Sequence, residues 1–244
     1  MMRRNNFPFS AVLGLNHAKT AILVVLVNPR AGGLLISGPQ GIGKSTLMRS
    51  TQELIERPWR DIPVSVTEDR LFGTIDTEKA IYSGQKKLYP GIINEADQGV
   101  LYLDDANLLR EDLLDSILNI AEVGAYQLER DGLSLRCDTS FTVIAAINPE
   151  SGMLSGACLD QFGLFVNVDN IHDENTRVEI LKRTISFEKD CASFCKLWKL
   201  ENEKIKKAIH SAMSLLPKVV VSSAMIQLAS VYLSLIHISE PTRP

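Results

Sequence analysis

Short apolar runs alternate with helix-like stretches along the chain up to about residue 150. The apolar runs are rich in Leu, Ile and Val and have the length of buried strands; they span 33–37, 62–66, 99–103 and 141–147. The stretches between them have a helical pattern and span 15–27, 46–57 and 112–123. Strands that alternate with helices predict an α/β fold, in which helices cover both faces of a parallel sheet.

Two segments interrupt this alternation. Residues 67–90 are rich in turn residues and charges, and we expect a helix there that is interrupted by an inserted loop or hairpin. Residues 129–136 carry the pair Asp131-Gly132, which is typical of a two-residue hairpin turn. Both segments are therefore predicted to be insertions into the sheet domain.

After residue 172 the pattern becomes helical. We expect charged helices at 174–190 and 201–215, and a third helix from Ser222 to about Tyr232. The chain thus divides into an α/β domain at 1–172 and a small, truncated all-helical lid at 173–232. Residues 233–244 resemble a translated sequencing adapter, so we expect this tail to be non-native and the natural protein to continue past Tyr232.

Composition narrows the class of protein. Of the 244 residues 45% are apolar and 23% are charged, as in ordinary globular domains, and the net charge of −3 argues against a broad nucleic-acid-binding face. The longest apolar run, 21–27, is far shorter than the roughly 20 residues of a membrane span. We predict no signal peptide and a cytoplasmic location, in which the four scattered cysteines are reduced thiols. The cysteines are Cys137, Cys158, Cys191 and Cys195.

The clearest chemical signal is the stretch 38–45, which reads G-x-x-x-x-G-K-S between a predicted strand and a predicted helix. Its glycines let backbone N–H groups turn towards polyphosphate oxygens, and the helix N-terminus adds the positive end of its dipole. Lys44 supplies a charge for the outer phosphates, and the Ser45 hydroxyl is suited to Mg²⁺. The sequence therefore predicts that ATP and Mg²⁺ bind here. The expected nucleotide-binding residues are Gly38, Gly41, Gly43, Lys44, Ser45 and Thr46.

Polar residues follow two further apolar strands. Asp104 and Asp105 end the strand at 99–103, and Asn148 ends the strand at 141–147. In phosphate-loop enzymes the first acid of such a pair holds Mg²⁺ and the second polarises the attacking water. Ligands of parallel sheets sit at the carboxyl ends of the strands, so these residues are expected beside the loop. We predict Ser45 and Asp104 as metal-holding residues, and Lys44, Asp105 and Asn148 as catalytic residues.

With these motifs in place, the chain resembles AAA+ ATPases, and more closely the ATPase (I) subunit of magnesium chelatase. The resemblance runs from about Phe9 to Tyr232, and its most specific stretches keep the order of the family. They are 67–76, 90–96, 101–109, 129–134 and 159–164. The two insertions at 67–90 and 129–136 also match insertions of that family.

The resemblance implies a motor that works with other subunits. Members of the family form a hexameric ring with ATP at the subunit boundaries. The ring works with a D-type ATPase-like subunit and drives a porphyrin-binding catalytic subunit to insert Mg²⁺ into protoporphyrin IX. On this view the chain hydrolyses ATP for tetrapyrrole biosynthesis, while the porphyrin need not touch it.

The chain departs from the family at two positions. Asp105 stands where the family has Glu, which withdraws the carboxylate by about 1.5 Å from a water that must be held in line. Gln161 stands where the family has the arginine finger that reaches the neighbouring subunit's γ-phosphate. The arginines at 130, 136 and 177 are unranked candidates for the missing charge, and a further arginine of the lid is expected beyond Tyr232. Both departures leave the rate of hydrolysis open.

Three alternatives follow. The chain could be a weakly hydrolysing, nucleotide-binding scaffold or regulator that behaves like the D subunit, and Asp105 and Gln161 favour this. A MoxR-type AAA+ chaperone has a similar architecture. An enhancer-binding transcription activator is disfavoured, because residues 74–90 lack the Gly-Ala-Phe-Thr-Gly-Ala loop of that class.

Overall fold

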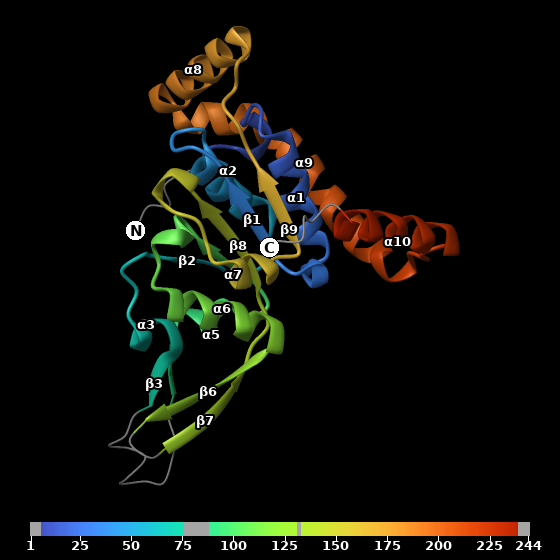
Figure 1. Cartoon of the computed structure of the whole chain (residues 1–244). Coiled ribbons are helices and arrows are strands. Elements are labelled where there is room, and N and C mark those ends of the chain that lie inside the picture. The colour runs from blue at the N-terminus through green and yellow to red at the C-terminus, as the bar shows by residue number, and fades with distance from the viewer. Residues whose placement is uncertain (1–5, 76–87, 131–132, 239–244) are drawn as a thin grey trace.

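The computed structural model describes residues 6–75, 88–130 and 133–238, and its centre is a five-stranded sheet of order β2-β5-β8-β1-β9 (Figure 1). Every neighbouring pair in this sheet is parallel. The strands are β1 Leu34–Ser37, β2 Trp59–Ile62, β5 Val100–Leu103, β8 Thr142–Ile147 and β9 Leu164–Asn167. This arrangement confirms the predicted α/β fold with a parallel sheet.

Two apolar clusters lie on opposite faces of the sheet because successive side chains of a strand alternate in direction. In β1, the side chains of Leu34 and Ile36 belong to the first cluster and that of Leu35 belongs to the second, and all three are buried. The first cluster is covered mainly by α1 Asn16–Val27 and α2 Lys44–Thr51, with η1 Phe9–Ala11. The second is covered mainly by α3 Glu68–Phe72, α5 Ile92–Glu95, α6 Glu111–Val123 and α7 Gly156–Asp160. A strand buried on both faces needs a continuous apolar run, which is why β1, β5 and β8 were predictable from the sequence.

The edge strands were predicted less well. The run at 62–66 is not a strand: β2 ends at Ile62, because Pro63 has no N–H to donate, and Val66 N donates to Pro63 O in a turn (3.0 Å). The edge strand β9 was not predicted, since its side chains alternate between half-buried and exposed and form no apolar run. The predicted helix at 46–57 begins earlier, at Lys44, and α2 ends at Thr51, followed by the turn η3 Gln52–Leu54.

Both predicted insertions are present at the same end of the molecule (Figure 1). The first contains α3 and the strands β3 Gly73–Ile75 and β4 Leu88–Pro90, which pair antiparallel; residues 76–87 lie outside the described residues. The second is the antiparallel pair β6 Ala125–Arg130 and β7 Leu133–Asp138, whose predicted Asp-Gly turn also lies outside them. The Tyr126 hydroxyl lies 2.7 Å from Phe72 O and 2.6 Å from Asn94 Oδ1, and so joins the two insertions.

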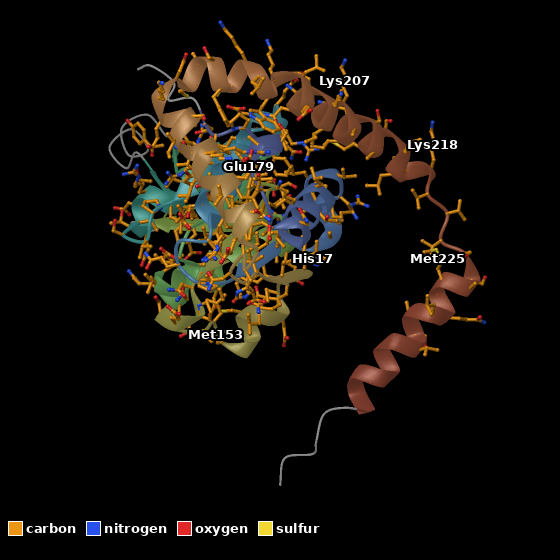
Figure 2. The ribbon with its side chains drawn as sticks, turned by 90° about the horizontal axis from the view of Figure 1, so that it is seen from above. His17, Met153, Glu179, Lys207, Lys218 and Met225 are labelled. Atoms are coloured by element: carbon orange, nitrogen blue, oxygen red, sulfur yellow. The ribbon has the colours of Figure 1, made fainter. Side chains whose placement is uncertain are left out.

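The C-terminal part is helical, as predicted, and consists of α8 Glu174–Lys189, α9 Cys191–Leu215 and α10 Ser223–Ile238. Helix α9 begins at Cys191 rather than at Glu201, because Phe194 and Trp198 pack in an aromatic cluster with Phe7 and Phe187. Figure 2 shows α10, marked by Met225, extending away from the sheet domain, and its side chains up to Val231 are exposed.

Short 3-10 turns complete the described structure. They are η2 Pro29–Ala31, η4 Ala106–Leu108, η5 Pro149–Ser151 and η6 Leu216–Lys218. Within the described ranges, no single helix has the length and apolar character to cross a membrane. Helices α9 and α10 together have that length and composition, but the pair is bent by 101°. The four cysteines form no disulfide with one another.

Candidate nucleotide site at the strand ends

The phosphate loop connects β1 to α2, and its shape depends on glycine. Gly41 and Gly43 have φ of 85° and 92°, a conformation that residues with a side chain rarely adopt, and Gly43 is the N-cap of α2. At Gly38 the constraint is space, since a Cβ there would lie 2.5 Å from Val168 O. A loop with this backbone turns N–H groups towards a common centre, which suits an anion at the N-terminus of α2.

Lys44 lies inside this loop rather than in solvent. Its side chain is buried, and Nζ donates to the carbonyl oxygens of Gly38 (2.6 Å) and Pro39 (2.8 Å). Burial lowers the pKa of Lys44 below its ordinary value, and the carboxylates of Asp105 and Asp104 oppose that shift. The ammonium group is thus held between the loop and the two acids, where it can meet the outer phosphates of a nucleotide.

Ser45 and Asp104 meet directly. The Ser45 hydroxyl donates to Asp104 Oδ1 at 3.2 Å, and the hydroxyl of Tyr102 donates to the same oxygen at 2.8 Å. Burial, followed by the charge of Asp104, raises the pKa of Tyr102 above its ordinary value. A hydroxyl and a carboxylate at the N-terminus of α2 are the oxygen donors that Mg²⁺ prefers.

Asp105 follows in an unusual backbone conformation. Its φ of 51° and ψ of 50° place it in the left-handed region, which Asp and Asn enter more readily than other residues with side chains. It is the N-cap residue of η4, and its carbonyl oxygen accepts the N–H of Leu108 at 2.8 Å. The loop after β5 therefore turns sharply at the second acid.

Asn148 lies at the end of β8, beside the start of the phosphate loop, because Gly38 N donates to Ile147 O at 3.2 Å. The buried Asn148 caps η5: Oδ1 accepts the N–H of Glu150 at 3.2 Å, and Nδ2 donates to Ser151 Oγ at 3.3 Å. Asn107, which the sequence analysis did not single out, connects this loop to the acidic loop. Its Nδ2 donates to the carbonyl oxygens of Asn148 (3.2 Å) and Gly152 (3.1 Å).

A cavity of about 760 Å³ opens between the phosphate loop and the helical region. Gly41, Gly43 and Thr46 form its loop side, and Arg177 and Arg183 are among the α8 residues on the opposite side. Most of its remaining wall is apolar and includes Val12, Leu13, Leu15, Ile42, Ile171 and Ile180. A cavity of this kind, next to a phosphate-binding loop, has room for a nucleoside.

These wall residues carried no signal in the sequence, because isolated apolar side chains at 12–15 and 171–180 look like ordinary core. His172 also lines the cavity. Arg183 could have been noticed only from its contacts, since its Nη1 donates to Ala11 O at 2.9 Å and its guanidinium lies 4.5 Å from the Trp198 ring centroid.

Gln161 lies apart from this constellation, at the end of α7. Its side chain is exposed, and Nε2 lies 3.5 Å from Ala157 O. Of the arginines considered for its charge, Arg177 lines the cavity and Arg136 pairs with Asp138 at 3.0 Å, while the side chain of Arg130 lies outside the described residues. In the described part of the chain no cluster of three or more His, Cys, Asp or Glu could hold a metal ion.

Comparisons with known proteins agree with this geometry. The family described as "AAA domain (dynein-related subfamily)" matches residues 33–161. The magnesium-chelatase 38 kDa subunit of Rhodobacter capsulatus is 35% identical, over 87% of this chain and 70% of the relative, and that of Chlorobaculum tepidum is 34% identical, over 90% and 67%. The magnesium-chelatase subunit ChlI homolog of Methanocaldococcus jannaschii is 33% identical, over 94% and 73%.

A solved structure is similar along most of the chain. It describes the complex between subunits BchI and BchD of magnesium chelatase, from a single-particle cryo-EM reconstruction. The matched chain is 35% identical with a TM-score of 0.65, and the match covers 88% of the present chain and 77% of the other.

Proposed function

Because the chain belongs to the family of magnesium-chelatase ATPase (I) subunits, which are AAA proteins, we propose that it binds and hydrolyses ATP as the motor subunit of a metal chelatase complex. The observation that carries the proposal is the gathering of Lys44, Ser45 and Asp104 around one phosphate loop. These are the groups that phosphoryl transfer requires for holding phosphates and a metal ion.

Each residue has a role that its position supports. The loop amides around Gly41 and Gly43 bind the phosphates, and the Lys44 ammonium group neutralises the outer ones. Ser45 and Asp104 hold Mg²⁺, which when bound neutralises charge on the phosphate oxygens. The carboxylate of Asp105 orients and polarises the attacking water.

Asn148 completes the list of predicted catalytic residues. From the end of β8 its amide would reach the γ-phosphate or the attacking water through the second N–H of Nδ2, because the first donates to Ser151 Oγ while Oδ1 accepts from Glu150 N. The nucleoside occupies the apolar cavity beside Thr46.

The assembly is part of the proposal. The relative of known structure is a complex of BchI with BchD, which supports a D-type partner for this chain. We place the chain in a homo-oligomeric ring, a hexamer, with ATP at the subunit boundaries, in the cytoplasm. The ring acts on a porphyrin-binding catalytic subunit and serves tetrapyrrole biosynthesis.

A second candidate function has support from Gln161 and Asp105. Gln161 is exposed and neutral where an arginine finger would act on the neighbouring subunit, and Asp105 has the shorter of the two acidic side chains. Both differences would lower the rate of ATP hydrolysis more than the affinity for ATP, so the chain would act as a nucleotide-binding scaffold or regulator.

Steady-state ATP hydrolysis tests both proposals. The full-length protein is measured alone and after mixing with a D-type partner, with Lys44→Ala as the control that removes the phosphate-binding charge. Turnover by the protein alone that Lys44→Ala abolishes supports the motor and contradicts the scaffold. Reconstituted insertion of a metal into protoporphyrin IX tests the chelatase role, which a complete lack of insertion of any metal would contradict.

A further inference from the structure

We propose that Tyr102 is a positioning residue of the Mg²⁺ site, whose hydroxyl fixes the Asp104 carboxylate in the orientation that receives the metal. The inference rests on the proposed function, because it deepens the role of the same site. It concerns a side chain within the strand β5 rather than in either nucleotide-binding loop.

Tyr102 places a polar hydroxyl in a buried, otherwise apolar strand. Its neighbours in β5 are Val100, Leu101 and Leu103, and the whole strand is buried. Only 2% of Tyr102 is exposed, and it packs in the apolar cluster with Ile144 and Ala146. A buried phenol must find a partner for its hydroxyl, and an apolar side chain at this position would avoid that requirement.

The partner that it finds is the acid of the metal site. Tyr102 OH donates to Asp104 Oδ1 at 2.8 Å, and the same oxygen accepts the Ser45 hydroxyl at 3.2 Å. Two donors on one oxygen restrict rotation of the carboxylate and leave Oδ2 for other ligands. A tyrosine hydroxyl carries one proton to donate, and here that proton is directed at the carboxylate.

A fixed carboxylate matters because groups that orient metal ligands affect metal affinity by about 10–100-fold. If Ser45 held a metal ion, its hydrogen bond to Asp104 would weaken, and Tyr102 would still donate to the carboxylate. Loss of this hydroxyl should therefore weaken Mg²⁺ more than it weakens the nucleotide itself.

The variant Tyr102→Phe isolates the hydroxyl, since the ring and its packing remain. The full chain is titrated with Mg²⁺ in the presence of a fluorescent, non-hydrolysable ATP analogue, and the same analogue is titrated in EDTA. We expect the Mg²⁺ concentration at half-maximal binding to rise by about tenfold in Tyr102→Phe, with unchanged affinity in EDTA.

Tyr126→Phe is the matched control. It removes another hydrogen-bonded phenol hydroxyl, 2.7 Å from Phe72 O, in an insertion away from the phosphate loop. Its Mg²⁺ midpoint should equal that of the wild type. A second variant, Asp104→Asn, is combined with Tyr102→Phe: if Tyr102 acts through Asp104, the double variant has the same Mg²⁺ midpoint as Asp104→Asn alone.

The outcomes are distinct. An unchanged Mg²⁺ midpoint in Tyr102→Phe overturns the inference, and so does an equal loss of affinity in EDTA, which would assign the hydroxyl to the loop as a whole. Additive effects in the double variant also overturn it. A wild-type protein that binds no analogue, with or without Mg²⁺, overturns the proposed function itself.

Discussion

Replacing Gln161 with arginine tests how the ATP site is completed. Gln161 ends the short helix α7, and its side-chain hydrogen bond to Ala157 O has a length of 3.5 Å, at the limit for such a bond. The side chain is exposed, so the substitution should change the free energy of unfolding by about 0.5 kcal/mol or less. The variant is expected to fold as the wild type does.

The effect of Gln161→Arg should appear in the rate of ATP hydrolysis. An arginine finger from a neighbouring subunit raises the rate of phosphoryl transfer by about 10³–10⁵. The lower figure corresponds to about 4 kcal/mol of barrier, several times the largest expected cost in stability. Because an arginine at position 161 would have to reach the neighbouring subunit of the proposed ring from an exposed helix end, we expect the lower figure, about 10³-fold in kcat.

The assay is steady-state ATP hydrolysis at a protein concentration where the ring forms. Gln161→Lys is the matched control, since it adds the same charge without the planar guanidinium group. Its rate of ATP hydrolysis should rise much less than that of Gln161→Arg. Action across the boundary is tested by mixing: Gln161→Arg combined with Lys44→Ala is inactive alone but should raise the rate of wild-type subunits.

Hydrolysis by Gln161→Arg at the wild-type rate, in assemblies of the same size, would contradict a finger role for position 161. Faster hydrolysis by Gln161→Arg with no gain in the mixed assemblies would contradict action across the boundary, because the charge would then act within its own subunit.

Further predictions concern single residues. Gly38→Ala should abolish nucleotide binding in equilibrium titrations, because its Cβ would lie 2.5 Å from Val168 O. Asp105→Glu should raise kcat by up to about 10²-fold, since it restores the longer reach, while lowering the melting temperature because Glu enters the left-handed region less readily. Asn107→Ala leaves two carbonyl oxygens without their donor and should lower the free energy of unfolding in urea by about 1–3 kcal/mol. Burial, followed by the neighbouring Cys191 thiol, raises the pKa of Cys195 from 9.0 to about 12, so its thiol stabilises the fold below pH 9.0 and this contribution is lost as the pH rises towards 12. At pH 9 iodoacetamide, followed by mass spectrometry, should therefore modify Cys195 more slowly in the folded chain than in urea.

Local signals explain what the sequence could predict. The loop at 38–45 was recognisable because glycine and lysine act there through the backbone and charge of one short segment. Asp104 and Asn148 were recognisable because each ends a strand buried on both faces, and parallel strands end at one edge. The insertions were also visible, from turn residues and the Asp-Gly pair.

Long-range contacts explain what was missed. The strand β2 pairs with β5 through Trp59 to Ile62, a register that depends on Gly99, where a Cβ would lie 2.1 Å from Pro58 O. Nothing within 59–66 reveals that close approach. Tyr102 looked like one more large residue in an apolar run, although its hydroxyl donates to the Asp104 oxygen that also accepts the hydroxyl of Ser45 from α2. The cavity wall is assembled from segments far apart in the chain, so no local pattern marks it.

The hydrogen bonds of Tyr126 connect the two insertions to each other. Helix α6, about 20 Å long, runs from near the acidic loop at one end to the base of β6 at the other. A tilt of α6 at its Asp105 end would therefore displace the hairpin at its other end. Because the Tyr126 hydroxyl lies within hydrogen-bond distance of Phe72 O and Asn94 Oδ1, such a movement of the hairpin would also act on α3 and α5. A partner that contacts one insertion would then act on the other as well.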